Sequence, residues 1–211
     1  FDLLHKAGIK CIPVVPNVKL AKRVQEKGAD AIVIEGAEAG GHDGTQTTMS
    51  LMENVLPEIE IPVAVAGSIS DGRAMAAALL MGAAGVQIGS RFLLAEECRT
   101  HQHMKDAILA ATDTDSILTG YTKNNIVRGL QNAFSARYLE REFAGAPAEE
   151  LNRLSAGTNR KAAVDGDIEN GFVLVGQSLN RLTRIQPAAD IVHEIVSEAQ
   201  SLLKHAPLLV K

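Results

Sequence analysis

Four short runs of apolar, largely β-branched residues alternate with longer helical segments from Gly8 to about Ser90. The runs are Ile9–Val15, Ala31–Gly36, Ile61–Gly67 and Gly85–Ser90. Continuous apolar runs of this kind are typical of parallel strands that are buried on both faces. The segments between them carry helix start and stop signals, and they are Val18–Gly28, Ser50–Ile59 and Asp71–Gly82. The order βαβαβαβ therefore predicts an α/β fold with a parallel sheet.

Two architectures fit this order, a doubly wound sheet and a (β/α)8 barrel. A dinucleotide-binding doubly wound sheet needs GxGxxG directly after its first strand, and no segment has that motif in that context. The barrel is therefore favoured. A barrel normally needs eight βα units in about 250 residues, whereas four strands are readable here. We expect the C-terminal half of a TIM barrel, strands 5 to 8, which requires a missing N-terminal half.

The pattern changes after Phe92 to mostly helical segments with polar connections. The predicted helices are His101–Thr112, Asn125–Glu142, Ala148–Ser155 and Asn159–Asp165. We interpret Asp113–Gly120 as a loop with a short extended piece. Apolar residues at helical spacing predict one long terminal helix over Ile185–Lys204.

Composition and charge exclude several classes of protein. With 46% hydrophobic and 22% charged residues, the 211-residue chain has the composition of a soluble globular protein with a sizeable core. Its net charge of -4 lacks the basic excess of a nucleic-acid binder. No apolar stretch reaches the roughly 20 residues that span a bilayer, and the chain starts without a signal-peptide pattern. We expect a cytoplasmic protein without nucleic-acid or membrane partners.

The cysteines and most histidines offer little chemistry at the level of sequence. Cys11 and Cys98 match neither CxxC nor a zinc-ligand spacing, so we expect two reduced thiols and no metal site. His101 and His103 would diverge by about 200° on a helix, which favours surface positions. The other three weak candidates, His5, His193 and His205, have no partner at a useful spacing.

The most informative segment is EGAEAGGHDG, Glu35–Gly44, which follows the second predicted strand. In parallel α/β folds, reactive groups collect at the carboxyl ends of strands. Gly40 and Gly41 would let the backbone approach a flat ligand closely and would place His42 for proton transfer. The alternative is a glycine-rich turn with an incidental exposed histidine.

Two further strand ends carry a glycine followed by serine, Gly67-Ser68 and Gly89-Ser90. In barrels the last two βα loops often bind phosphate through backbone N–H groups, and small residues are needed because a side chain would block contact. The alternative is that both glycines only turn the chain. Two such pairs on successive strands favour phosphate binding and suggest strands seven and eight.

These segments resemble the FMN-dependent barrels that include nitronate monooxygenase and enoyl-acyl carrier protein reductase II. EAGGH at Glu38–His42 resembles the family motif, AGSISDG at Ala66–Gly72 is similar to its AGGIxDG, and VQIGSRF at Val86–Phe92 is similar to its VQxGTRF. Ser68 and Ser90 replace the usual glycine and threonine. Glu35 and the segments 91–101, 113–120, 127–132 and 162–178 resemble the reductase (FabK-type) branch more closely.

The resemblance implies three regions. Residues 1–92 would form the barrel units, 93–184 an inserted helical substrate-binding domain, and 185–211 a C-terminal helix that returns to the barrel. It also implies an FMN-dependent oxidoreductase of fatty-acid biosynthesis that uses NADH or NADPH to reduce trans-2-enoyl thioesters of acyl carrier protein. We expect a homodimer.

The resemblance also assigns roles to individual residues. His42 would be catalytic, by orienting the thioester or taking part in proton transfer. The residues expected to bind the cofactor are Glu35, Ala39, Gly40, Gly41, Gly67, Ser68, Gln87, Gly89, Ser90 and Gln177. Of these, Gly67, Ser68, Gly89 and Ser90 would hold the FMN phosphate.

Two other functions stay open at this point. A nitronate monooxygenase would use the same FMN with O2 to oxidise nitronates or nitroalkanes, with His42 as the base for a neutral nitroalkane. A natural half-barrel could instead be a non-catalytic assembly or binding module.

Overall fold

The computed structural model describes residues 1–209, which divide into two compact units. Unit 1 comprises residues 1–38, 44–88 and the part of the chain from 192 onward, and unit 2 comprises residues 39–43 and 89–191. None of the described helices combines the length and the apolar character needed to cross a bilayer.

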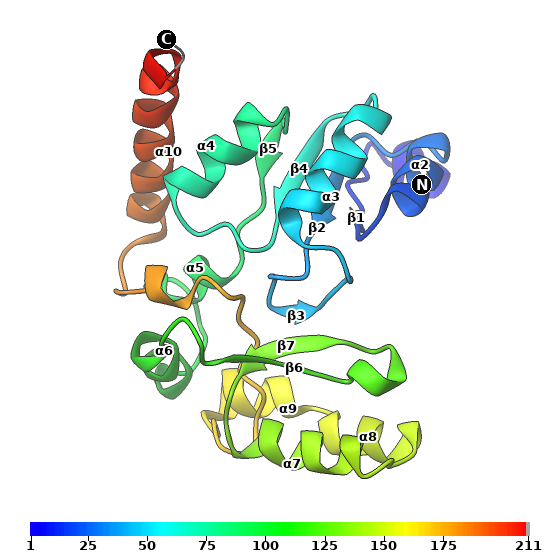
Figure 1. The fold of residues 1–211 in the computed structure, drawn as a ribbon, viewed down its shortest axis with the longest axis vertical. Helices are drawn as coiled ribbons and strands as arrows, with labels where there is room; N and C mark the ends of the chain where they lie inside the picture. Colours follow the sequence, from blue (N-terminus) through cyan, green and yellow to red (C-terminus); the bar gives the residue numbers. More distant parts are fainter. Residues whose placement is uncertain (210–211) are drawn as a thin grey trace. The chain divides into compact units, whose positions relative to one another are not determined.

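Unit 1 contains a four-stranded parallel sheet in the order β1-β2-β4-β5 (Figure 1). Its strands are β1 (Val14–Val15), β2 (Ile32–Glu35), β4 (Val63–Ala66) and β5 (Gly85–Val86). The register aligns Val15 with Ile34 and Val65 with Val86. The predicted α/β fold with a parallel sheet is therefore confirmed.

The first predicted strand is shorter than its apolar run. Only Val14–Val15 is a strand, whereas Ile9 and Ile12 are more than half exposed. Pro13 has no N–H to donate to a ladder, although its carbonyl accepts a hydrogen bond from Val33 at 2.9 Å. The run therefore becomes regular only after Pro13.

Helices connect the strands as the sequence predicts. They are α2 (Val18–Glu26), α3 (Thr48–Val55) with the 3-10 turn η1 (Leu56–Glu58), and α4 (Gly72–Leu80), preceded by the short α1 (Asp2–Lys6). Asn17 and Asp71 cap α2 and α4, because their side chains accept hydrogen bonds from Leu20 N and Ala74 N. The core of this unit includes Ile32, Ile34, Leu51, Val55 and Val65.

The long helix α10 (Ala188–His205) packs against the start of α4 in unit 1. Gly72 lies so close to the backbone of Ile195 and Ala199 that a Cβ there would come within 2.6 Å of it. Glu198 accepts a hydrogen bond from Gly72 N at 2.8 Å, which satisfies a free N–H at the start of α4. The turn η5 (Ala206–Leu209) follows α10.

Unit 2 is built on an antiparallel sheet in the order β3-β7-β6. Its strands are β3 (Gly41–His42), β6 (Ser116–Thr119) and β7 (Val127–Leu130). The predicted helix over Asn125–Glu142 is therefore wrong in its first part. Backbone pairing of β7 with both neighbours satisfies its hydrogen bonds, and Asn132 then starts the helix α7 (Ala133–Phe143) with a capping box.

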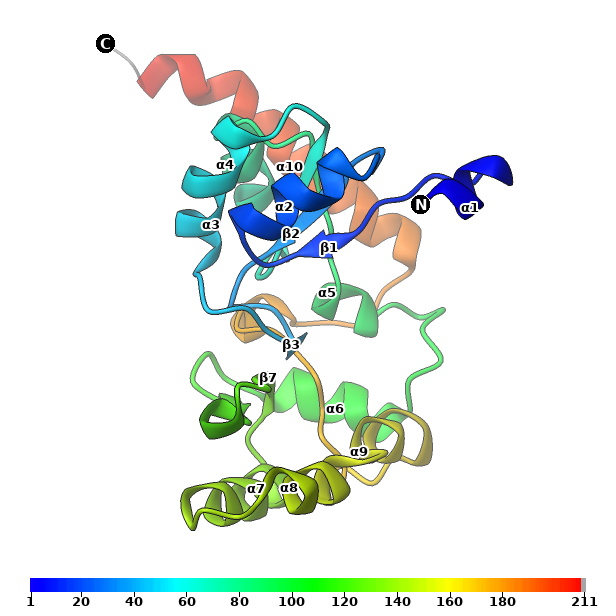
Figure 2. The same ribbon diagram turned by 90° about the vertical axis from the view of Figure 1, so that its right-hand side faces the viewer.

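The remaining elements of unit 2 are short helices around this sheet. They are α5 (Ser90–Leu93), α6 (Gln102–Ala110), η2 (Tyr121–Lys123), α8 (Ala148–Ser155), α9 (Thr158–Arg160), the π-helical turn η3 (Lys161–Asp165) and η4 (Leu179–Arg181). The helices α7 and α8 lie side by side (Figures 1 and 2). Phe134, Tyr138 and Phe172 are buried in one core cluster, whereas Met104, Ile108 and Val175 belong to another.

Candidate active site

The carboxyl ends of the parallel strands in unit 1 lie at one edge of the sheet. Glu35 is paired in register with Ala66, and Gly36 N donates a hydrogen bond to Ala66 O at 3.2 Å. Gln87 N donates to Val65 O at 2.9 Å. Glu35, Gly67 and Gln87 therefore lie at the carboxyl ends of neighbouring strands, at the same edge of the sheet.

Glu35 is half-buried at this edge, and burial raises the pKa of its carboxyl group. Desolvation disfavours the charged form of a carboxyl group. Glu35 therefore places a carboxyl group with a raised pKa at the carboxyl ends of the parallel strands.

The loop after β2 is held to unit 1 by Glu38 and Thr48. The Glu38 carboxylate accepts hydrogen bonds from the Thr48 amide and hydroxyl, both at 2.8 Å, at the start of α3. The Thr48 hydroxyl also contacts the carbonyl oxygen of Gly67. Sequence reasoning missed Thr48, although an acidic residue ahead of a helix start is a signal for this kind of contact. This network ties the β2 loop to the end of β4.

His42 lies on the two-residue strand β3 in unit 2, and it is exposed. It is paired with Val127, and its neighbour Asp43 donates a backbone hydrogen bond to Ile126 O at 3.0 Å. The segment thus combines a turn and bend over residues 37–40 with an extended Gly41–His42 that is paired with β7. The imidazole is presented from a defined strand.

A buried ion pair stands beside His42. Arg128 Nε lies 3.4 Å from Asp43 Oδ2, and the two side chains are 7% and 0% exposed. Arg128 also donates to Ser116 Oγ at 3.1 Å, which connects β3, β7 and β6 through one guanidinium group. Sequence reasoning did not identify this pair, because its members are distant in the chain.

Three predicted cofactor segments meet within unit 2. A Cβ on Gly40 would lie 2.5 Å from the Val175 carbonyl carbon, so Gly40 is packed directly on the Val175–Gly176 backbone. Gly176 N donates to Ser90 Oγ at 2.9 Å. Gln177 follows as an exposed residue.

Neither the backbone conformation nor the packing at position 89 requires a glycine. The φ of Gly89, -104°, is open to other residues, and no atom lies within 4 Å of the position where its Cβ would be. Gly41 also has open space, but its φ of +102° requires glycine. Ser90 Oγ accepts from Gly176, so its hydroxyl proton is left to donate. Open space beside a hydroxyl donor fits an anionic group such as a phosphate.

The predicted residues fall into two sets. Glu35, Gly67, Ser68 and Gln87 belong to unit 1, and Ala39, Gly40, Gly41, His42, Gly89, Ser90 and Gln177 belong to unit 2. Within unit 1 the strand ends share one edge. Within unit 2, Gly40, Ser90 and Gly176 are linked by contact.

The structure gives the surroundings of four other histidines, of which His103 is exposed, as predicted. His101 is the N-cap residue of α6 and has no helical conformation, so its ring does not diverge from that of His103, and the ring centroids are 4.5 Å apart. His5 does have a partner, Asp30, at 2.9 Å. His205 Nδ1 contacts Ser201 O at 2.7 Å.

A separate pocket of about 220 Å³ in unit 2 lies near the end of β7. Its lining includes Ala107, Leu130, Asn132 and Val173. None of the predicted site residues lines it.

The residues 1–198 match the family model of nitronate monooxygenase. The chain belongs to this family. It is 32% identical over 212 residues to a "Probable nitronate monooxygenase" of Staphylococcus aureus strain MSSA476, and the match covers 96% of this chain and 59% of the relative. The chain thus spans about three fifths of the length of such relatives.

Two solved structures of the family's fold are similar to the chain. FabK from Thermotoga maritima has a TM-score of 0.94 and 36% identity, with 99% of this chain and 66% of that one covered. Nitroalkane oxidase from Streptomyces ansochromogenes has a TM-score of 0.80 and 28% identity, with 96% and 60% covered. The chain therefore shares its fold with both of these proteins.

Proposed function

We propose that the chain is part of an FMN-dependent enoyl-acyl carrier protein reductase that uses NADH or NADPH. The observation that carries this proposal is the likeness to FabK, with 36% identity and a TM-score of 0.94, against 28% and 0.80 for nitroalkane oxidase. The reductase-like Glu35 supports the same choice. The substrate would be a trans-2-enoyl thioester of acyl carrier protein.

We propose that the predicted cofactor residues bind flavin mononucleotide. Gly89 with its open side, together with the free donor of Ser90, would hold the phosphate, assisted by Gly67 and Ser68. The residues that would lie against the rest of the cofactor are Glu35, Ala39, Gly40, Gly41, Gln87 and Gln177. Bound FMN would supply hydride transfer between the nicotinamide and the substrate.

His42 would act on the substrate. An exposed imidazole on a paired strand can donate a hydrogen bond to a thioester carbonyl or give a proton to the α-carbon. The Asp43–Arg128 pair would act through β3, by keeping the backbone of His42 in place.

The test of His42 is stopped-flow flavin absorbance in two stages. We expect His42→Ala to retain FMN and to be reduced by NADH at nearly the normal rate. Oxidation by an enoyl thioester should then be slower by on the order of 10²–10⁴-fold, the usual contribution of a positioned acid or base. His193→Ala, another exposed histidine, is the matched control. Equal losses in both stages, or no loss, would remove His42 from this role.

The test of the phosphate site compares two glycines that both have open space. We expect Gly89→Val to fold and to lose FMN, because the added side chain occupies the space of the phosphate. Gly85→Val, at the opposite end of β5, should fold and retain FMN. The flavin-to-protein absorbance ratio after purification and circular dichroism measure both properties. Full FMN content in Gly89→Val would show that the phosphate binds elsewhere.

A second candidate is oxidation of nitronates with FMN and O2, with His42 as base for neutral nitroalkanes. It is favoured by the family model and by the names of the S. aureus relatives. Consumption of NADH that depends on an enoyl thioester supports the reductase, whereas O2 uptake with nitronate and no need for NADH supports the monooxygenase.

We also propose that unit 1 is the C-terminal half of a TIM barrel and that residues 93–184 are an insertion for substrate binding. The exposed apolar residues Ile9, Ile12 and Val14 at the β1 edge support continuation of the sheet. The sequence encoded upstream of Phe1 tests this: four further βα units are expected. A cytoplasmic homodimer is the expected assembly, and light scattering of the purified protein checks it.

A further inference from the structure

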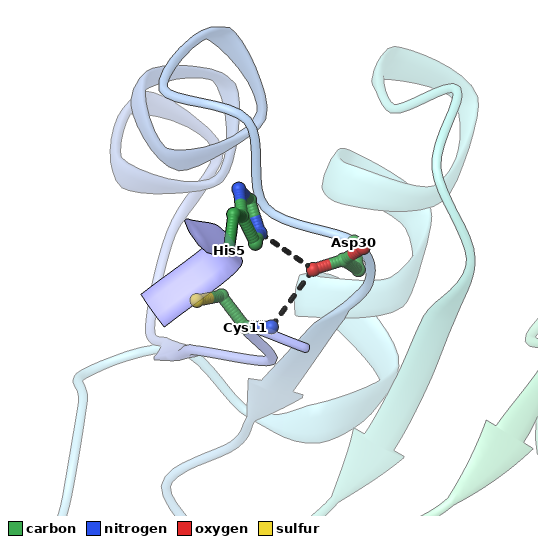
Figure 3. A group of neighbouring side chains, drawn as sticks. All are labelled: His5, Cys11 and Asp30. Carbon is green, nitrogen blue, oxygen red and sulfur yellow. Dashed lines mark hydrogen bonds and ion pairs between the residues drawn. The ribbon is translucent and has the colours of Figure 1, made fainter. Parts of the chain in front are cut away.

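Three potential metal ligands from separate segments meet in unit 1 at the end of the sheet opposite Glu35. They are His5 on α1, Cys11 ahead of β1, and Asp30 ahead of β2 (Figure 3). One ligand atom of each residue, a ring nitrogen, the Sγ and a carboxylate oxygen, lies within 4.8 Å of the other two. This group is at the amino ends of the strands, so it is separate from the proposed active-site edge of unit 1.

The Asp30 carboxylate is held in a fixed orientation. Asp30 Oδ2 accepts hydrogen bonds from Cys11 N at 2.8 Å and from His5 Nε2 at 2.9 Å, and Oδ1 accepts one from Lys10 Nζ at 2.7 Å. The carboxylate is therefore oriented by three donors before any ligand binds.

The thiol of Cys11 is the second unusual feature. Cys11 is 4% exposed and is not in a disulfide. Within residues 1–209, no hydrogen bond to its Sγ is present. The ion pairs of His5 and Lys10 with Asp30 do not involve the Cys11 sulfur. They therefore do not account for the position of this sulfur beside His5 and Asp30. The His5 side chain is 35% exposed, which leaves a path from solvent.

We propose that His5, Cys11 and Asp30 form a binding site for a borderline-soft divalent cation such as Zn²⁺, with solvent as the fourth ligand. Imidazole, thiolate and carboxylate are the usual protein ligands of Zn²⁺, and three of them with an open position form a common site. Mg²⁺ and Ca²⁺ are disfavoured, because they prefer oxygen ligands.

Binding requires a small rearrangement of the group. Metal–ligand bonds of about 2.0–2.3 Å place tetrahedral ligand atoms about 3.3–3.8 Å apart. The three ligand atoms lie within 4.8 Å of one another, and His5 Nε2 must exchange its 2.9 Å hydrogen bond to Asp30 Oδ2 for a bond to the cation. The short helix α1 has no buried residue, so His5 can move without disturbing the core. The Lys10 side chain is 77% exposed and can turn into solvent when the cation arrives.

The experiment is titration of the intact, reduced protein with Co²⁺, followed by competition with Zn²⁺. We expect one equivalent of Co²⁺ to give visible bands of a tetrahedral site and a near-ultraviolet thiolate charge-transfer band, both removed by Zn²⁺. Cys11→Ser should lose the charge-transfer band, and His5→Ala should weaken binding at least tenfold. Cys98→Ser, which removes the other free thiol, should leave the spectrum unchanged.

A second measurement distinguishes loss of the metal site from misfolding of a variant. Thermal unfolding without metal shows whether each variant folds, and added Zn²⁺ should raise the midpoint of the wild type and of Cys98→Ser but not of Cys11→Ser. Absence of a charge-transfer band, a band that Cys98→Ser abolishes, or binding that His5→Ala leaves unchanged would each overturn the site.

Discussion

The parallel sheet of unit 1 and the antiparallel sheet of unit 2 are stabilised in different ways. In unit 1 the strands β1 and β4 are each followed directly by a helix, and the side chains of Asn17 and Asp71 cap these two helices. In unit 2, β3 is a two-residue strand that is paired with a strand beginning at Val127, and the buried Asp43–Arg128 pair fixes that pairing. His42 is therefore held beside a buried ion pair between distant segments, whereas the edge that carries Glu35 lies on an apolar core, with the Glu38–Thr48–Gly67 contacts at its loops.

The largest effect should come from breaking the buried ion pair. Asp43→Ala leaves Arg128 without its carboxylate partner in a buried site, so we expect a loss of about 3–5 kcal/mol of folding free energy. Hydrogen exchange should show lost protection in β3, β6 and β7 and little change in β2 and β4. The double variant Asp43→Leu with Arg128→Met should recover much of the stability. Uniform loss of protection in both sheets would contradict the comparison.

An intermediate loss of stability should distinguish the alanine variants of two asparagines that cap helices, Asn17 and Asn132. Asn17 accepts a hydrogen bond from Leu20 N and lies exposed, so Asn17→Ala should cost about 1 kcal/mol. Asn132 also caps a helix, but its Nδ2 donates to Ile168 O at 2.6 Å and Gly171 O at 2.7 Å. Asn132→Ala should therefore cost roughly 2–4 kcal/mol, as a cap and two further bonds are lost.

Aspartate variants sharpen the test of these caps. Asn17→Asp keeps the cap acceptor and should change stability by less than about 0.5 kcal/mol. Asn132→Asp keeps the cap but loses both donated bonds, so it should remain clearly destabilised. Chemical denaturation of the four variants measures the difference, and similar values for Asn17→Asp and Asn132→Asp would mean that only the local caps matter.

The smallest effect concerns Glu35 and pH. Burial raises its pKa in the folded state, so the folded protein binds the proton more tightly than the unfolded chain does. The stability from this group is complete below the unfolded pKa of 4.5 and is lost as pH rises through the folded value. We expect Glu35→Gln to gain stability relative to wild type at neutral pH and to lose that gain below the unfolded pKa. Denaturation curves across this range check the sign, and an advantage that grows toward acid would refute the assignment.

The sequence alone determined the strands and helices of unit 1 to a good extent. Apolar β-branched runs and capping residues act over a few neighbours, so Ile32–Glu35, Val63–Ala66 and the helix starts after Asn17 and Asp71 could be predicted from local pattern. The family motifs also pointed to His42 and to the glycine-serine pairs.

Only the tertiary structure decided the pairings between distant segments. Val127–Leu130 was predicted as helix, because apolar spacing cannot show that β3 and β6 will satisfy its backbone on both sides. The Asp43–Arg128 pair and the meeting of His5, Cys11 and Asp30 escaped prediction for the same reason. Such contacts form where the folded backbone brings distant segments together. The spacing of residues within one segment does not show which other segment will lie beside it.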